Sequence, residues 1–352
     1  MILENKILIC YNEPTKYYDN YLGKELKESN EDSDLSEREF LKQIANIKKS
    51  LLNKYVSVET LAVNSDIKTA LKKILQYSPD IIFNFVESVE GNTNLESYVA
   101  GMFDLIGIPY TGNSAMTLGN CLVKSRTKQI LQSYKIRTPK HFTAGINSVP
   151  KKDKFILKYP VILKLVREDA SIGISEFSVV NNYEAMIERF NFLFNSFKQD
   201  VLIEEYIEGR ELNVAILGDK ILPISEIRFD GLPEELPKIV TYEAKWAAES
   251  IYFKHTTPKC PATLNESIRK KVEKLARAAY DALDCRDYAR VDIRLNQKNV
   301  PYVIEVNPNP DISPDTGFVR SAAAADINYD ELLYILSTFA RKRTGYDSQA
   351  AS

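Results

Sequence analysis

The sequence predicts an α/β protein that begins with a parallel sheet, and two observations carry this prediction. Apolar segments that end in polar loops, at 6–14 and 78–88, are separated by two stretches with helical spacing, at about 37–52 and 65–77. Strands that alternate with helices are typical of a parallel sheet. Near the C-terminus, 288–295 and 302–310 alternate apolar and polar residues across the turn "NQKN". This second pattern predicts a half-buried β-hairpin.

The N-terminal elements end in a turn. The charge-rich stretch 23–39 is predicted to be an exposed loop or the start of a helix. Residues 95–106 have helical spacing and stop at Gly107, a residue suited to the left-handed end of a helix. A short strand and a turn at Thr111 and Gly112 are expected to follow and to close the first domain.

The middle of the chain predicts a second set of strands and helices. A helical pattern runs from Cys121 to about Ser133, and "YPVILKLV" predicts a buried strand that contains one lysine. Small and polar residues then indicate a flexible loop between that strand and the next, "FSVV". A helix near 182–194 and a strand "DVLIEEYI" that breaks at Glu208 and Gly209 complete this part.

A long surface helix precedes the hairpin. Residues 263–283 carry apolar side chains at helical spacing, with Thr263 as the predicted N-cap. The last residues, 343–352, are polar and are expected to be disordered.

Composition excludes several classes of function. A chain of 352 residues suggests two or three domains, and a net charge of −2 gives no electrostatic reason to expect nucleic acid or an anionic membrane as a partner. Apolar runs are much shorter than the ~20 residues of a spanning helix, and no signal-like segment opens the chain, so a cytoplasmic protein is expected. The four cysteines are scattered and the chain has only two histidines, so a disulfide framework, a zinc site and a His-based hydrolytic triad are not expected.

The hairpin carries the strongest chemical signal. Alternation places Asp292 on one strand near Glu305 and Asn307 on the other, and two carboxylates with an amide oxygen are ligands that Mg²⁺ prefers. Arg290 lies two residues before Asp292 and adds an anion-binding group. A solvated acidic face would explain Asp292 and Glu305 alone, but the added Asn307 and Arg290 favour metal and anion binding.

Two lysines and a loop indicate phosphate binding. Lys164 lies in an apolar strand and requires an anionic partner, either a phosphate or a carboxylate. Lys124 lies at a helix start, and the loop with Ser171 and Gly173 could enclose phosphates with its N–H groups. The chain has no GxxxxGK[ST] and no GxGxxG, so P-loop and dinucleotide sites are excluded.

A strand end and a short acidic segment complete the candidate site. The backbone at Glu205 to Ile207 could meet an adenine edge, with Glu211 available for ribose hydroxyls, although an acidic strand end on the surface is the plainer alternative. "YEAKW" adds Lys245, within reach of a terminal phosphate, and Trp246, which would otherwise be a core residue.

Together these segments resemble a known family. From "PDIIFN" to "YDELLYIL", the motifs "LIGIPYTG", "VKSRTKQIL", "YPVILKLVREDASIGIS", "LIEEYIEGRELNVAILG", "YEAKW", "CPA", "DYARVDIRL" and "IEVNPNPDISP" occur in the order found in ATP-grasp carboxylate-amine ligases, and are similar to those of D-alanine–D-alanine ligases. The resemblance implies an ATP-grasp fold of mixed α/β (α+β) class. It implies an N-terminal preATP-grasp domain at 1–113, a central lid at 114–207, and a C-terminal Mg-ATP domain at 208–342.

The resemblance also implies residue roles. ATP would be bound by Lys124 and Lys164 at the α- and β-phosphates, by the loop at Ser171 and Gly173, and by Glu204, Glu205, Tyr206, Ile207 and Glu211 at the nucleoside. Lys245 would contact the γ-phosphate and Arg290 would stabilise a developing oxyanion. Asp292, Glu305 and Asn307 would hold two Mg²⁺ ions, with Mn²⁺ as a possible substitute. A homodimer is the assembly that the family implies.

Departures from the family fall at the amino-acid subsites. Where the family has a glycine-rich loop with a glutamate for the first D-alanine, this chain has "CYNEPTKYYDN", in which Glu13 is the expected substrate ligand although the match is poor. Ala170 replaces the first serine of the phosphate loop, and Trp246 replaces a tyrosine. The region of the second D-alanine holds Asp311, Pro314, Asp315 and Thr316.

Altered subsites on an intact ATP scaffold indicate a different substrate. The sequence therefore predicts an ATP-dependent ligase that joins an acid to an amino-acid amine through an acyl phosphate, in specialised metabolism, for example on a mycosporine-type cyclic acceptor. One alternative is a D-alanine–D-alanine ligase of cell-wall synthesis. The other is an ATP-binding regulatory protein with reduced catalysis, which the intact Lys245 and Arg290 disfavour.

Overall fold

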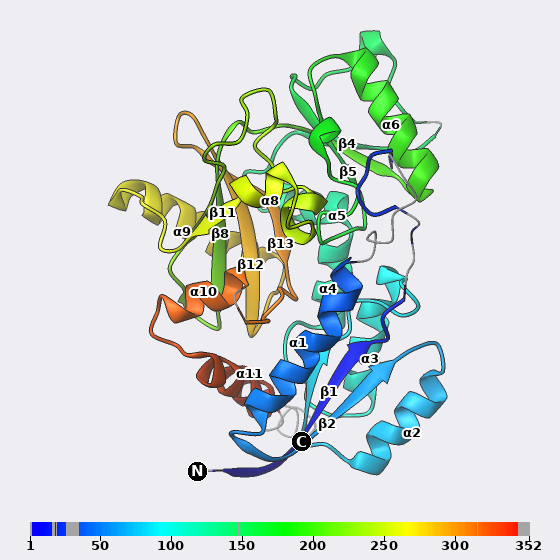
Figure 1. The fold of residues 1–352 in the computed structure, drawn as a ribbon, viewed down its shortest axis with the longest axis vertical. Helices are drawn as coiled ribbons and strands as arrows, with labels where there is room; N and C mark the ends of the chain where they lie inside the picture. The colour runs from blue at the N-terminus through cyan, green and yellow to red at the C-terminus, as the bar shows by residue number, and fades with distance from the viewer. Residues whose placement is uncertain are drawn as a thin grey trace.

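The computed structural model describes residues 2–15, 18, 20–25, 35–146, 148–314 and 316–343. It contains a three-stranded, a four-stranded and a six-stranded sheet, each with helices packed against it (Figure 1). Asp315, residues 344–352 and residues 26–34 of the charge-rich stretch lie outside the described part, so the predictions for Asp315 and for all of the tail except Arg343 are not addressed.

The N-terminal sheet is parallel, as the alternation of strands and helices predicts. Its strand order is β2-β1-β3, with bounds Tyr55–Val63, Leu3–Asn12 and Ile81–Phe85. Its helices are α1, α2, the short 3₁₀ helix η1 and α3, at Leu35–Leu51, Ile67–Tyr77, Thr93–Leu95 and Glu96–Leu105. The sequence reading missed β2. The strand expected after Gly107 is only an isolated bridge between Ile82 and Tyr110, because a single residue pairs with the sheet there.

The helix predicted from Cys121 to Ser133 is two helices. Helix α4 covers Ala115–Leu122 and α5 covers Lys124–Ser133, and the break is at Val123, whose backbone is extended. Ser114 caps α4 by accepting a hydrogen bond from the Thr117 N–H. The break makes Lys124 the first residue of α5, where its side chain can reach the loop after β5.

The central sheet has the order β4-β7-β5-β6, at His141–Ala144, Val201–Glu205, Val161–Leu165 and Val179–Val180. Helix α6, Tyr183–Phe197, packs its buried side chains, among them Phe190 and Leu193, onto this sheet. The 3₁₀ helices η2, Lys152–Lys154, and η3, Glu176–Ser178, lie in its loops. This unit stands at the top of the molecule, beyond α5 (Figure 1).

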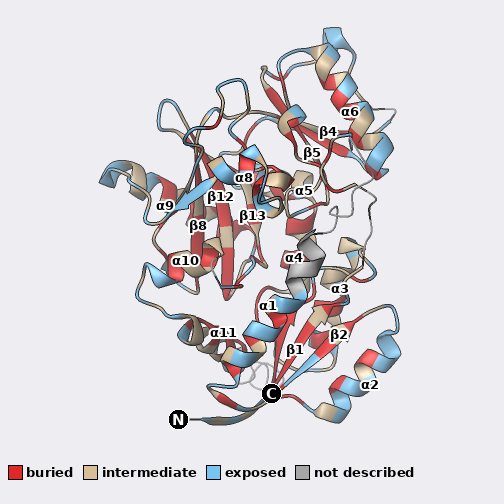
Figure 2. Cartoon of the chain, in the orientation of Figure 1, coloured by how far each residue is buried: buried red, intermediate tan, exposed pale blue. Residues whose placement is uncertain are grey.

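The C-terminal sheet contains the predicted hairpin. Its order is β11-β10-β8-β12-β13, at Thr257–Lys259, Ser225–Arg228, Gly209–Leu217, Tyr288–Asn296 and Pro301–Asn307, and β9, Lys220–Ile221, pairs with β8. The predicted surface helix is α9, Glu266–Ala282, which buries Val272, Ala276 and Ala279. Its cap is Asn265 and not Thr263, because the Asn265 side chain is the one that accepts from the Ile268 N–H. Figure 2 shows the strands largely buried and the outer faces of α2 and α9 exposed.

Four further helices complete the fold: α7, α8, α10 and α11, at Tyr242–Trp246, Ile251–His255, Gly317–Ala323 and Tyr329–Arg343. Helix α11 returns to the N-terminal sheet, where Leu332 and Leu336 pack with Ile7 and Phe83. The two ends of the chain therefore share one hydrophobic core. No helix in the described residues is long and apolar enough to cross a membrane.

Candidate active site

A cleft of about 860 Å³ lies where the three sheets meet. The predicted site residues that line it are Lys124, Lys164, Ser171, Glu204, Glu205, Tyr206, Ile207, Glu211, Lys245, Trp246, Arg290, Asp292, Glu305, Asn307, Asp311 and Thr316. Two do not line it, Gly173 and Glu13. Tertiary structure thus brings together residues that are spread over nearly 200 positions of the sequence.

The hairpin places the predicted metal ligands side by side. In the antiparallel pairing of β12 and β13, Asp292 is opposite Glu305 and Arg290 is opposite Asn307. Side chains of directly opposite residues share a face, with Cβ atoms about 5 Å apart. Arg290 holds Asp292 through two hydrogen bonds, of 2.8 and 2.9 Å, and Asn213 donates a third at 2.7 Å. The predicted convergence of the carboxylates is confirmed.

These oxygens suit a hard cation chemically. Each carboxylate has more lone pairs than its present partners use, and Asn307 contributes an amide oxygen. No three His, Cys, Asp or Glu side chains gather into a metal cage within the described residues. A Mg²⁺ ion held by one or two carboxylates would therefore complete its shell with phosphate oxygens or water, which is the usual arrangement for this ion.

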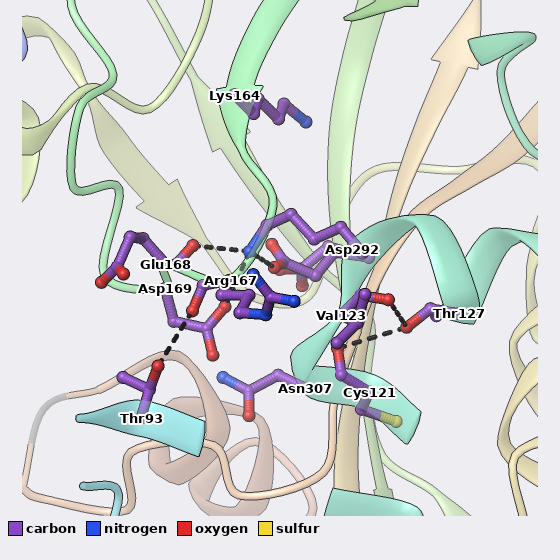
Figure 3. Close-up of polar contacts among 12 residues, drawn as sticks. Thr93, Cys121, Val123, Thr127, Lys164, Arg167, Glu168, Asp169, Asp292 and Asn307 are labelled. Carbon is purple, nitrogen blue, oxygen red and sulfur yellow. Dashed lines mark hydrogen bonds and ion pairs between the residues drawn. The ribbon is translucent and has the colours of Figure 1, made fainter. Parts of the chain in front are cut away.

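Lys124 joins the hairpin to the loop after β5. Its Nζ lies 3.1 Å from Glu305 Oε1 and 3.0 Å from Asp169 Oδ1, and it donates to the Glu168 carbonyl at 2.5 Å. Burial alone would raise the pKa of Glu305, but the charges of Lys124 and Lys164 outweigh it and hold this pKa well below its usual value. In Figure 3 Asp169 lies on the side of Asp292 and Asn307, whereas the Glu168 carboxylate points away from them.

Lys164 has a carboxylate partner, as its place in an apolar strand requires. Its Nζ lies 2.7 Å from Glu204 Oε1, and the second oxygen of Glu204 lies 2.7 Å from Nζ of Lys128. Glu204 was expected at an adenine contact, yet its side chain is buried between two lysines and its backbone pairs within the central sheet. Burial would raise its pKa, but the two ammonium groups lower it to about 2.

The strand end after β7 retains one backbone donor. The Glu205 N–H bonds the Lys140 carbonyl at 2.9 Å and the Tyr206 N–H bonds the Pro160 carbonyl at 2.9 Å. Ile207 lines the cleft, and its N–H meets no backbone acceptor within the described residues. A single N–H at this edge could serve an adenine nitrogen.

Glu211 is not free, contrary to the sequence expectation. One of its oxygens accepts from the buried Arg294 at 2.8 Å. Arg294 also donates to the Ile207 carbonyl at 2.9 Å and to the Lys238 carbonyl at 2.8 Å, and its guanidinium lies over the Tyr206 ring. Arg294 therefore fixes the shape of the strand end, and Glu211 neutralises it.

The phosphate loop is tightly turned. Ala170 and Ser171 have left-handed backbones, at φ 52° and 63°, which is uncommon for residues with a side chain. Trp246 Nε1 donates to the Ala170 carbonyl at 3.3 Å, so α7 contacts this loop directly. Trp246, which was predicted to bind substrate, therefore lines the cleft and is not simply a core residue.

Residues 20–25 of the N-terminal segment dock on the far side of the same loop. The Gly173 N–H bonds the Tyr21 carbonyl at 2.9 Å, and Arg189, which is buried, donates to the carbonyls of both Gly23 and Gly173. A Cβ on Gly23 would lie 2.4 Å from the Gly173 carbonyl carbon, so only glycine permits this approach. Lys24 extends the contact with ion pairs to two carboxylates.

Lys245 carries a positive charge into the cleft. Its side chain is solvent-accessible and has no ion-pair partner within the described residues. The pKa of Lys245 is lowered first by the loss of water around its ammonium group and secondly by the positive charge of Arg290. Arg290 is already paired with Asp292, so Lys245 is the cation of this pair that is left for an anionic ligand.

The predicted amino-acid subsite is only partly assembled. Glu13 is exposed, accepts a hydrogen bond from Asn64 at 2.8 Å and does not line the cleft, so the structure does not bring it together with the other predicted site residues. Asp311 does line the cleft, and it accepts from Ser313 N and Oγ at 2.7 and 2.5 Å. Thr316 Oγ1 donates to the carbonyls of Asp311 and Ser313, so it shapes the turn.

Sequence reasoning missed three charged residues of the site. These are Lys128, Asp169 and Arg294. Lys128 is four residues after Lys124, a spacing that places both on one face of α5, and this was an available signal. Arg294 is two residues after Asp292, which places both on one face of β12, but its partner Glu211 lies far away in the chain, and Asp169 gave no local signal.

The chain is similar to known proteins over most of its length. Residues 130–338 match the family described as D-ala D-ala ligase C-terminus. The chain is 30% identical over 296 residues to an uncharacterized protein of Sinorhizobium fredii, covering 81% of this chain and 84% of that protein. It is also 30% identical to the D-alanine–D-alanine ligase of Carboxydothermus hydrogenoformans, covering 81% and 88%.

A solved structure has the same fold. The D-alanine–D-alanine ligase from Bacillus anthracis complexed with ATP superposes with a TM-score of 0.72 at 23% identity, covering 98% of this chain and 99% of that one.

Proposed function

The chain belongs to the D-alanine–D-alanine ligase family, whose members are ATP-dependent ligases that form C–N bonds, and from this premise we propose that it joins a carboxylic acid to the amine of an amino acid other than D-alanine. ATP activates the acid. The proposed chain organisation is an N-terminal domain at 1–113, a lid at 114–207 and a Mg-ATP domain at 208–342, with ATP between the last two.

The proposed reaction has two steps. The γ-phosphoryl group of ATP passes to a carboxylate oxygen, which gives an acyl phosphate and ADP. The amine nitrogen then attacks the acyl carbon, phosphate leaves with the C–O bond electrons, and the nitrogen loses a proton. Phosphoryl transfer depends mainly on positioning and charge neutralisation. Bound Mg²⁺ would supply part of that neutralisation.

The cationic side chains of the cleft supply the rest. Lys124 and Lys164 would bind the α- and β-phosphates, Lys245 the γ-phosphate, and Arg290 the oxyanion that develops at the acyl carbon. The loop would cover the phosphates at Ser171, whereas Gly173, whose N–H is bonded to the Tyr21 carbonyl, would support the turn. Asp292, Glu305 and Asn307 would hold the metal. The free N–H of Ile207, with Glu205 and Tyr206 beside it, would contact the adenine, and Glu211 would reach the ribose with its second oxygen.

One observation carries the substrate proposal. Glu13, the carboxylate best placed in the sequence to bind an amino group, is held by Asn64 outside the cleft. A D-alanine bound at this end would lose a charge-assisted hydrogen bond of about 1.5 to 3 kcal/mol. At the other end, the exposed Asp311 carboxylate would repel an incoming carboxylate. Both subsites therefore disfavour D-alanine.

The test is a coupled assay of ADP release. D-Alanine is compared with a panel of amino acids, each with and without a second acid. We expect another acid and amine pair to give a higher kcat/KM than two D-alanines. Efficient D-alanyl-D-alanine synthesis above every other pair would restore the cell-wall function. ATP binding without ADP release for any pair would point to a regulatory protein instead.

A homodimer is proposed through the outer face of α3 and α4. Tyr98 and Leu105 on α3 are 71% and 90% exposed, and Met116 on α4 is 71% exposed. Tyr98 and Leu105 are seven residues apart, which places them on one face of α3, and large apolar side chains this exposed are typical of an interface. Sedimentation of wild type and Leu105→Arg would test it: a dimer that dissociates in the variant supports the proposal, and a monomeric wild type contradicts it.

A further inference from the structure

Glu204 is shared by two lysines with unequal surroundings. Lys128 and Lys164 each lie 2.7 Å from a different oxygen of this buried carboxylate. The Lys128 side chain is 2% exposed and does not line the cleft, whereas that of Lys164 is 16% exposed and does. The cluster therefore has a closed end and an end that opens on the cleft.

Lys128 is held by three contacts. Besides its ion pair with Glu204, its ammonium donates hydrogen bonds to Thr138 Oγ1 at 3.0 Å and to the Ile304 carbonyl at 3.2 Å. These contacts, together with its burial, keep the Lys128 ammonium in place. Within the described residues Glu204 is the one ion-pair partner of Lys164. Lys164 therefore keeps donors that it can direct toward the cleft.

The charge of the cluster depends on Lys128. Two ammonium groups and one carboxylate sum to one positive charge, and the exposed end of the cluster is where an anion can approach it. Without Lys128 the remaining pair of Glu204 and Lys164 would be neutral. The Lys164 ammonium would then be held by a carboxylate that has no other counter-charge.

We propose that Lys128 is a positioning residue for nucleotide binding: it binds Glu204 from the closed side and so leaves the Lys164 ammonium available to a nucleotide phosphate. This inference rests on the proposed binding of phosphate by Lys164. Lys128 itself does not contact the nucleotide. Its effect is transmitted through Glu204, which stays ionised and stays in place when Lys164 turns toward the phosphate.

The test compares ADP binding by calorimetry, in the presence of Mg²⁺, for wild type and four variants. Lys128→Met keeps the length of the side chain and removes its charge, so we expect ADP to bind about 10-fold to 100-fold more weakly, the range for one hydrogen bond to a charged group. In the double variant Lys128→Met/Glu204→Gln no carboxylate competes for Lys164. Affinity should then return to within about three-fold of wild type.

Two further variants separate the possible failures. Lys164→Met tests the nucleotide site itself, and Lys274→Met removes an exposed lysine on α9, far from the cleft, as the control for loss of one charge. If wild type does not bind ADP, or if Lys164→Met binds it equally well, the proposed nucleotide site is wrong. If wild type binds and Lys128→Met binds equally well, only the role of Lys128 is wrong.

If Lys128 only stabilised the fold, the ADP affinities of the single and double variants would differ from those expected above. Loss of the Thr138 and Ile304 contacts would weaken the fold in both variants that lack Lys128, and the double variant would bind no better than the single one. That result overturns the inference. In turnover assays the single variant should raise the KM for ATP with little change in kcat. If the single variant folds poorly, wild-type affinity in the double variant supports the inference, and weak binding by a folded double variant overturns it.

Discussion

Glu305 is the residue at which the proposed metal site and the phosphate-binding lysines meet, being opposite Asp292 and 3.1 Å from Lys124. Glu305→Gln keeps the shape and removes the charge, so we expect an intact fold and a loss of Mg²⁺-dependent turnover of about 10²-fold or more. ADP release measured against Mg²⁺ concentration checks this. Glu249→Gln, at a fully exposed carboxylate, is the control. Near-normal turnover in Glu305→Gln would refute the metal site.

The lowered pKa of Glu204 makes the stability of the fold depend on pH. Its folded pKa of about 2 is below the ordinary 4.5, so the ionised form stabilises the folded state at neutral pH. That stabilisation is fully present above pH 4.5 and is lost as the pH falls toward 2. It amounts to about 3 kcal/mol. Urea unfolding at pH 6 and pH 3 should show a steeper loss in wild type than in Glu204→Gln, and equal losses in the two would contradict the prediction.

The loop after β5 is in direct contact with residues 20–25 of the N-terminal segment, because the backbones of Gly23 and Gly173 touch. Gly23→Ala would place a Cβ 2.4 Å from the Gly173 carbonyl carbon and force the segment away from the loop. We expect it to raise the KM for ATP several-fold and to lower the free energy of unfolding by more than the roughly 1 kcal/mol that a left-handed backbone costs alanine.

The matched control for Gly23 is Gly107. It has the same left-handed backbone, with φ 68° against 69°, but a Cβ there would meet no atom within 4 Å. Gly107→Ala should therefore show the backbone cost alone and an unchanged KM. Equal effects of the two substitutions, measured by urea unfolding and steady-state kinetics, would mean that the contact between Gly23 and Gly173 has no functional role.

At the scale of the whole molecule, Lys24 joins three parts of the chain. Its Nζ lies 3.2 Å from Glu176 in η3 and 2.7 Å from Glu243 in α7, and all three side chains are partly buried. Lys24→Met should loosen the contact between the N-terminal segment, η3 and α7, and lower kcat/KM about three-fold to ten-fold, which equals roughly 0.7 to 1.4 kcal/mol. X-ray scattering should show a larger radius of gyration.

The control for Lys24 is Lys254→Met, which breaks an exposed ion pair with Glu249. Surface pairs of this kind contribute little to stability, so both the kinetics and the scattering should match wild type. An unchanged radius of gyration together with an unchanged kcat/KM in Lys24→Met would show that closure does not depend on this lysine.

Local periodicity determined much of the fold in advance. Strands β1, β3, β5 and β7, helices α2, α6 and α9, and the β12–β13 hairpin all follow from patterns that repeat within one element. The pairing of Asp292 with Glu305 follows too, because a short turn fixes the register of a hairpin. Family resemblance added the order of the motifs. A break in a helix has no such period, so the separation of α4 from α5 at Val123 was missed.

Tertiary structure alone decided which charges meet. Glu13 was expected in the cleft and is held by Asn64, whereas Lys128 was not singled out and shares Glu204 with Lys164. These partners come from different elements, and a sequence pattern within one element carries no information about which side chain another element will present. The sequence by itself therefore determined the elements and the kind of chemistry. Packing between elements decided which residues can take part in it, because an ion pair exists only where both groups are brought within a few ångströms.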